Sequence, residues 1–215
     1  LGLPDVPVTD IWVSGTSLAI ATHGRSFYVM DNLTTLRQFA GMLADVTLFQ
    51  PPDAIRGLDR VLIDYYLKAQ PKNLTLEILD GQGAVMRAFT GQPPKAEGEG
   101  DDDRPRGPQT TVPMTAGMNR ATWDLASTPV VGFPGMILWG ATQNGPTVLP
   151  GRYQVKLTAD GVTQTQPLTI TKHPLRDISD ADLLFQWELA SRIRDKVNEA
   201  NLSVVKIRRI KTEAA

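Results

Sequence analysis

The chain has 215 residues, of which 41% are hydrophobic and 21% charged, values that are ordinary for a globular protein. Its formal net charge of −1 excludes a global field that would attract nucleic acid or an anionic membrane surface, so we predict no nucleic-acid partner. It has no cysteine, which excludes disulfides and a cysteine nucleophile, and no apolar run approaches the roughly 18 residues of a membrane span.

Three short strands are predicted at the start of the chain, at residues 6–13, 18–22 and 26–31, because β-branched and aromatic residues flank a turn at Gly24. A three-stranded meander alone buries too little apolar surface to be stable. We therefore expect it to pack against neighbours outside this sequence, as one blade of a β-propeller does within its ring. The chain starts at Leu1 without a visible signal peptide, so we expect it to begin inside a longer protein.

The next part of the chain alternates strand patterns with turn signals. Residues 39–56 are predicted to be a connector, because their two adjacent prolines favour a rigid extended segment. Strands are expected at residues 61–67, 74–79 and 84–89, the last two joined by a turn. Residues 91–117 are rich in proline, glycine and charge, and we expect them to form a disordered loop.

The strongest strand signal is a hairpin at residues 149–171. Tyr153, Val155 and Leu157 alternate with polar residues, so one side of that strand is expected to face a core. Asp160 and Gly161 supply the turn, since Asp-Gly favours tight hairpins. A further strand is predicted at residues 118–125, followed by a long apolar loop at 126–148.

A long helix is predicted from residue 180 to residue 211, with Ser179 as its N-cap and carboxylates in its first turn. Apolar residues recur along it at spacings of three and four: Leu183, Trp187, Ala190, Ile193, Val197, Ala200, Val204 and Ile207. A sandwich of this size is too small to cover the whole stripe. We therefore expect the helix to pair with another helix, and helix-mediated self-association is one predicted interaction.

Two sets of motifs resemble known families. LPDVPVTDI and LAIATHGRSFYVMDNLTTLRQ resemble the last blade of bacterial BNR-repeat or sortilin-type β-propeller proteins, which are glycosyl-hydrolase-like. This chain has Ser26 where a second glycine is usual, and it lacks the Asp-box signature SxDxGxxW. DYYLK, LTLEILDGQGAVMRAF, GMNRATWDL and LPGRYQVKLTADGVTQTQPLTI are similar to the Ig-like module of flagellar hook-cap (FlgD-type) proteins. In the propeller family the same module follows the terminal blade.

The resemblances imply a mainly β fold in three parts. These are a partial β-propeller blade with its connector at residues 1–50, an Ig-like antiparallel β-sandwich at 51–175, and a long C-terminal α-helix at 176–215. They also imply that the protein is exported to the periplasm or cell exterior, with the remainder of the parent propeller as its main partner. The family gives this module a structural role and no catalytic residue to transfer.

Candidate catalytic groups are few. Asp64, Asp80 and Asp124 are associated with strands, but glycoside hydrolysis needs two carboxylates at a defined separation, and Asp80 is explained by its turn. His23 and His173 are far apart and belong to no cluster with metal-ligand spacing. We therefore predict no catalytic residue, no metal site and no cofactor within this chain.

The predicted ligand or partner contacts are Phe133, Trp139 and Trp187. Phe133 and Trp139 lie in the apolar loop, where aromatic rings either stack on a carbohydrate or pack on adjoining protein. The acidic run at residues 97–103 is expected to be solvated, with weak calcium binding as the alternative. The predicted function is a non-catalytic structural and interaction module; the alternative is an accessory or carbohydrate-binding part of a glycoside hydrolase.

Overall fold

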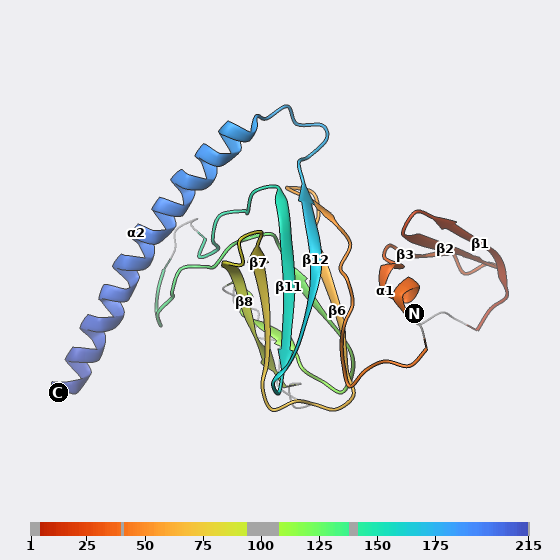
Figure 1. Cartoon of the computed structure of the whole chain (residues 1–215), viewed down its shortest axis with the longest axis horizontal. Helices are drawn as coiled ribbons and strands as arrows, with labels where there is room; N and C mark the ends of the chain where they lie inside the picture. Colours follow the sequence, from red (N-terminus) through yellow and green to blue (C-terminus); the bar gives the residue numbers. More distant parts are fainter. Residues whose placement is uncertain (1–4, 40, 94–107, 138–141, 215) are drawn as a thin grey trace.

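The computed structural model describes residues 5–39, 41–93, 108–137 and 142–214. It is mainly β with a long C-terminal helix, which confirms the predicted fold class at that level. Figure 1 shows three parts: a small N-terminal sheet, a central body of strands, and helix α2 (Asp180–Glu213) along the opposite side of the body.

The N-terminal sheet consists of β1 (Val8–Ser14), β2 (Ser17–Thr22) and β3 (Phe27–Met30), paired antiparallel in that order. Their bounds lie within two residues of the predicted strands. The short helix α1 (Thr34–Gln38) follows and leads into the central body.

The central body contains two sheets. One is antiparallel, in the order β10 (Gly117–Trp123), β6 (Val61–Leu67) and β4 (Val46–Leu48). The other is a curled six-stranded sheet in the order β5 (Ala54–Ile55), β12 (Val162–Thr171), β11 (Gly151–Ala159), β7 (Leu74–Asp80), β8 (Val85–Gln92) and β9 (Thr111–Pro113). Its four middle strands are antiparallel, whereas β5 and β9 each pair in parallel with their neighbour.

Alternate residues of both sheets fill a single core. Tyr153, Val155 and Leu157 of β11 are buried, which confirms the inward face that their period of two predicts. The fully buried Trp123 of β10 packs edge-to-face on Tyr153, with ring centroids 6.2 Å apart. Its indole N–H donates a hydrogen bond to the carbonyl of Ala126 at 2.8 Å, so its polar atom is satisfied. Burial raises the pKa of the Tyr153 hydroxyl to about 12.

Two glutamines of β12 join the rims of the two sheets. Gln164 accepts a hydrogen bond from the Leu48 N–H at 2.7 Å and donates one to the Val46 carbonyl at 2.8 Å. Gln166 donates to the Leu48 carbonyl at 2.9 Å. At the other rim, the Tyr65 hydroxyl donates to a carbonyl of β9. These side chains satisfy backbone groups that no neighbouring strand pairs, so the two sheets close around the core.

Two predicted loops contain strands. The expected connector at residues 39–56 contains β4 and β5, and the range 91–117 expected to be disordered contains the end of β8 and all of β9. Both expectations are wrong at those residues; residues 94–107 lie outside the described part of the chain. The short strands form because they pair with segments distant in sequence, such as β5 with β12, and no local pattern encodes that pairing.

Helix α2 begins at the predicted residue and is about 51 Å long at roughly 1.5 Å per residue. The Ser179 hydroxyl accepts a hydrogen bond from the Asp182 N–H at 3.1 Å, which confirms the predicted N-cap. Leu183 and Asn201 are its buried residues, so most of the predicted apolar stripe does not face the body. In the described ranges, no helix combines the length and apolar character needed to cross a membrane.

Candidate interaction surfaces

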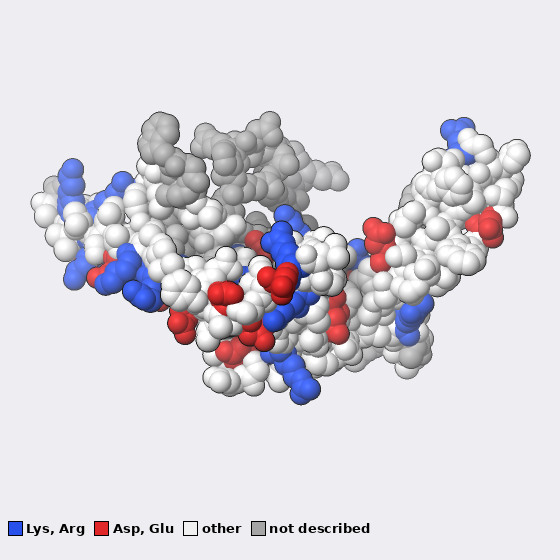
Figure 2. Space-filling view, turned by 90° about the horizontal axis from the view of Figure 1, so that it is seen from above, with Lys and Arg blue, Asp and Glu red and all other residues white. Residues whose placement is uncertain are grey.

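The N-terminal sheet carries uncovered apolar side chains on one face. Cross-strand pairing places Trp12, Ala19 and Val29 in one row, and Phe27 projects from the same face. The exposed fractions of Trp12, Phe27 and Val29 are 68%, 75% and 59%. Figure 2 shows this part of the molecule, on the right, with few charged residues on the visible side. Contiguous exposed apolar surface of this kind marks a contact site.

The opposite face of the same sheet is also apolar. Ile11, Ile20 and Tyr28 form a paired row across the three strands. Ile20 is buried, and every other residue of these strands is at least partly exposed, including Ile11 at 59%. A sheet that is apolar on both faces is typical of a layer with neighbours on each side.

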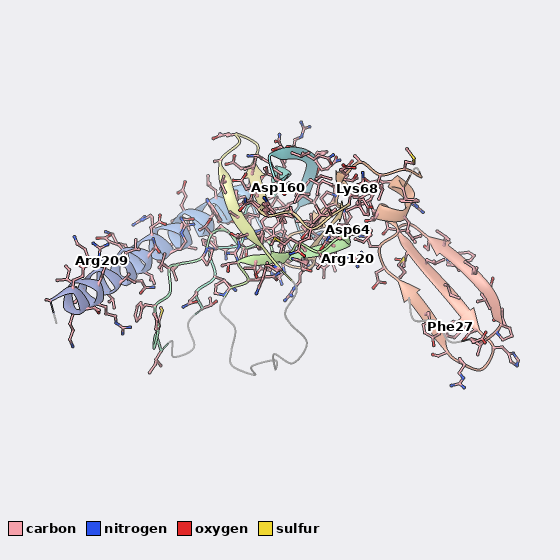
Figure 3. The ribbon with its side chains drawn as sticks, turned by 90° about the horizontal axis from the view of Figure 1, so that it is seen from below. Phe27, Asp64, Lys68, Arg120, Asp160 and Arg209 are labelled. Carbon is pink, nitrogen blue, oxygen red and sulfur yellow. The ribbon has the colours of Figure 1, made fainter. Side chains whose placement is uncertain are left out.

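Asp64 connects the N-terminal part to the body. Its carboxylate accepts hydrogen bonds from Nε and Nη2 of Arg120 at 2.6 and 2.9 Å, and from Oγ1 of Thr35 at 2.6 Å. Thr35 belongs to α1, while Asp64 and Arg120 lie on β6 and β10, and all three line a cleft to which Met30 of β3 also contributes. Figure 3 shows Asp64 and Arg120 close together, on the side of the body that faces the N-terminal sheet. Burial alone would raise the pKa of Asp64, but the hydrogen bonds and the charge of Arg120 outweigh burial and lower it.

The three strand-associated acids take part in separate local networks. Asp80 accepts hydrogen bonds from the N–H groups of Gln82 and Ala84 in its turn, and Asp124 accepts one from the Ala126 N–H. Asp64 is held at the α1 junction instead. Within the ranges the structure describes, no group of three His, Asp or Glu side chains is placed to hold a metal ion.

Phe133 and Trp187, the two predicted aromatic contacts that the structure describes, lie at different positions along α2. The guanidinium of Arg208 lies 4.7 Å from the ring centroid of Phe133, which covers one face of that ring. Trp187 is partly buried against the core, so its ring contributes to packing of α2. Positions 187 and 208 are about 31 Å apart along the helix axis. Trp139 and the acidic run at residues 97–103 lie outside the described residues.

Helix α2 contacts the loop after β10 through polar side chains. Oδ1 of Asn198 accepts a hydrogen bond from the Val131 N–H at 2.9 Å, and Nδ2 of Asn201 donates one to the Val131 carbonyl at 2.8 Å. The two amides thus satisfy both backbone groups of one loop residue, as a neighbouring strand would. Sequence reasoning missed this contact; the available signal was two asparagines three residues apart on one side of a helix.

The apolar side of α2 lies beside this polar contact. Ala190, Ile193, Val197, Ala200, Val204 and Ile207, here called the α2 seam, recur at alternating spacings of three and four residues. Ile193, Val197 and Ile207 are exposed by 57%, 39% and 65%. That spacing is the heptad pattern of helices that pair with another helix. Basic residues gather toward the C-terminal end of α2, at the left of Figure 2.

No protein-family model matches the chain, and no curated protein matches it either. The resemblances inferred from the strand motifs therefore remain expectations. The features that bear on function are the two-faced N-terminal sheet, the Asp64 junction and the α2 seam.

Proposed function

We propose that this chain is a non-catalytic structural and interaction module at the C-terminus of a larger exported β-propeller protein. In this proposal β1–β3 form part of the terminal blade, the body is an Ig-like sandwich, and α2 is an assembly element. The observation that carries the proposal is the N-terminal sheet, because both of its faces are apolar and Ile20 alone is buried among its strand residues.

The two apolar faces of this sheet suit contact with the neighbouring blades of a propeller. A blade inside a propeller ring is covered on both faces, and full burial of a large apolar side chain contributes about 2 kcal/mol. Trp12 and Phe27 on one face and Ile11 on the other are each more than half exposed here. The body supports the Ig-like part of the proposal, because two sheets with antiparallel inner strands enclose one core.

The test compares amide hydrogen exchange in β1–β3 between this chain and the natural full-length protein. If further blades cover the sheet, exchange should slow by about tenfold or more in the longer protein, because the covered strands open only with their neighbours. Exchange in β7 and β11 is the internal control, since those strands are already buried here. Equal exchange in both proteins, or a natural protein without further blades, contradicts the proposal.

The alternative function, carbohydrate binding, has a separate test. A glycan array probed with the chain and with Phe133→Ala measures whether the loop aromatic contributes. Since Arg208 already occupies one face of the Phe133 ring, we expect no glycan binding that depends on this side chain. Binding that the substitution abolishes would favour the accessory function instead.

We further propose that the α2 seam pairs with α2 of a second copy in the antiparallel orientation. Asp180 and Asp182 make the first turn of the helix acidic, whereas the last turns carry basic residues that include Lys211. In an antiparallel pair centred between Val197 and Ala200, the acidic end of each helix lies beside the basic end of the other. A parallel pair would place Lys211 against its own copy, which like-charge repulsion disfavours.

Sedimentation velocity over a range of concentrations tests this pairing. Ile193→Glu places a charge in the seam and should weaken self-association by about tenfold or more. Leu202→Glu is the matched control, because Leu202 is also exposed (47%) but lies on the opposite side of the helix. A strictly monomeric wild-type chain, or equal effects of the two substitutions, contradicts the pairing and leaves the blade proposal intact.

A further inference from the structure

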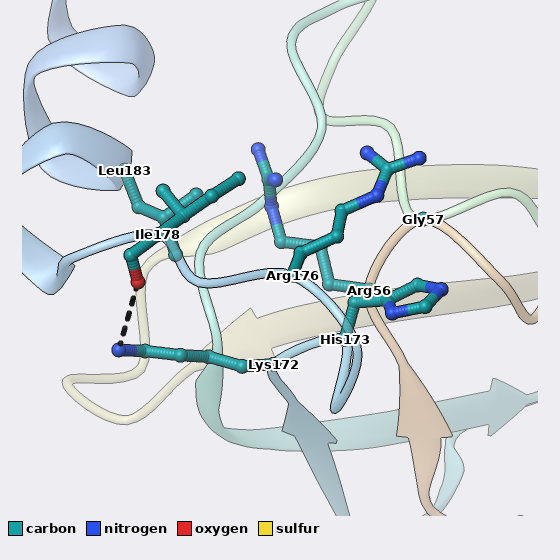
Figure 4. A pocket seen from close by; sticks show the side chains of 7 residues that line it. All are labelled: Arg56, Gly57, Lys172, His173, Arg176, Ile178 and Leu183. Carbon is teal, nitrogen blue, oxygen red and sulfur yellow. Dashed lines mark hydrogen bonds between the residues drawn. The ribbon is translucent and has the colours of Figure 1, made fainter.

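A basic pocket lies where the chain leaves β12 and enters α2 (Figure 4). Its polar lining comes from Arg56, Lys172, His173 and Arg176, and Ile178 and Leu183 supply apolar surface. In Figure 4 the two arginine side chains extend toward the same side of the pocket. Arg56 follows β5, so residues more than a hundred positions apart in sequence converge here.

Within the part of the chain that the structure describes, neither arginine of this pocket forms an ion pair. Arg56 is held in place, because its Nε donates to the Val148 carbonyl at 2.9 Å and its Nη2 donates to Oε1 of Gln186 at 3.1 Å. Among the described residues, no carboxylate lies within 4.0 Å of either guanidinium. Burial lowers the pKa of Arg56, and the charge of Arg176 lowers it further, so the two groups repel each other.

Two other polar side chains line the pocket, His173 and Lys172. His173 adds a hydrogen-bond donor, and neither side chain cancels the charge of the two arginines. Nδ1 of His173 accepts a hydrogen bond from the Leu175 N–H at 3.2 Å, so the proton of the neutral ring sits on Nε2, which is then a donor. Lys172 is paired with Asp180, because its Nζ lies 2.6 Å from Oδ1 of that carboxylate. The carboxylate of Asp180 is thus engaged with Lys172.

We propose that this pocket binds a phosphate-type oxyanion. The remaining N–H groups of Arg56, the guanidinium of Arg176 and the His173 ring N–H belong to side chains that line the same pocket, and guanidinium groups match the oxygen geometry of phosphate and carboxylate. A tetrahedral group with three or more acceptor oxygens can engage all three donors, whereas a carboxylate has only two oxygens. Binding would also relieve the repulsion between Arg56 and Arg176. The site is independent of the proposed blade and seam contacts.

Titration of the isotope-labelled chain with inorganic phosphate, followed by two-dimensional amide NMR, tests the proposal. Saturable shifts are expected at residues 56–57 and 172–178, and acetate should bind more weakly than phosphate. Arg176→Gln should lower phosphate affinity by about fivefold, as expected for one partly exposed charge contact. Arg176 is exposed, so this variant should fold, and unchanged shifts elsewhere in its spectrum verify that.

The matched control is Arg25→Gln, which removes the same charge from the exposed turn between β2 and β3. This control should bind phosphate as the wild type does. Absence of saturable shifts at millimolar phosphate overturns the proposal. Equal affinity of the two variants, or equal binding of acetate and phosphate, overturns it as well, because either result means unspecific attraction to basic surface.

Discussion

Replacement of Asp64 by asparagine tests how the N-terminal part is attached to the body. The substitution keeps the size of the side chain but removes the charge that faces Arg120. It also places an amide N–H₂ group where one carboxylate oxygen accepts a hydrogen bond from Arg120 or Thr35. The side chain is only 5% exposed, so solvent cannot replace the lost interactions. Arg120 is 53% exposed and can turn to water, which limits the loss.

These considerations set the expected magnitude. Losing charge-assisted hydrogen bonds at a buried acceptor should lower the free energy of unfolding by about 2 kcal/mol. For a chain of this size that corresponds to a fall in Tm of about 4–8 °C. Asp45→Asn is the matched control, because Asp45 pairs with Lys68 at 2.8 Å while both side chains are largely exposed. That control should leave stability unchanged within error.

Urea unfolding at several pH values provides the assay. The pKa of Asp64 is lowered in the folded state, so its contribution is fully present above the pKa of an unfolded aspartate, about 3.9. It is lost as pH falls through the folded-state value. The stability gap between wild type and Asp64→Asn should therefore narrow in acid. A gap no larger than that of Asp45→Asn, or one that widens as pH falls, would refute the reasoning.

Two other substitutions test packing elsewhere. Gly145→Ala would place Cβ against Oγ of Ser127 and 2.5 Å from the Thr128 carbonyl, so urea unfolding should show a loss of about 1–3 kcal/mol in the free energy of unfolding. Unchanged stability would mean that this loop shifts freely. Asn198→Ala should speed hydrogen exchange of the Val131 amide by about tenfold, because the substitution removes the oxygen that accepts its hydrogen bond. Asn201→Ala is the control and should not change that rate, because Asn201 donates to the Val131 carbonyl instead.

Strand alternation made much of the β architecture predictable. The hairpin at β11 and β12 was expected because Tyr153, Val155 and Leu157 show a period of two and Asp160-Gly161 fits a tight turn; both turn residues have positive φ. The buried Arg87 also fits the period of two, since it lies two residues before the inward-facing Phe89 on the same strand. Its guanidinium is accommodated because it donates to carbonyl groups and packs 5.1 Å from the Phe89 ring centroid.

The contacts of α2 show why the rest was not predictable. A helical stripe is assumed to face the core because burial of apolar surface drives packing. Here the buried side of the helix contains Asn201, because the loop it meets presents backbone amides that need partners. The stripe begins on the core at Leu183 and Trp187 and then passes to the exposed side at Ile193. The basic pocket was equally hidden, since Arg56 reaches it only through the pairing of β5 with β12.

The edge strands of the curled sheet and of the N-terminal sheet differ in how readily another polypeptide can pair with them. The curled sheet ends in β5 and β9, which have two and three residues, and edge strands this short offer little for an incoming chain to pair with. Strand β1 differs, because it has seven residues, none of them buried, and β2 is its partner on one side. Compared with β5 and β9, β1 is therefore the edge that is more open to donor-strand addition and edge-to-edge aggregation, and a charged or proline substitution at its centre would suppress both.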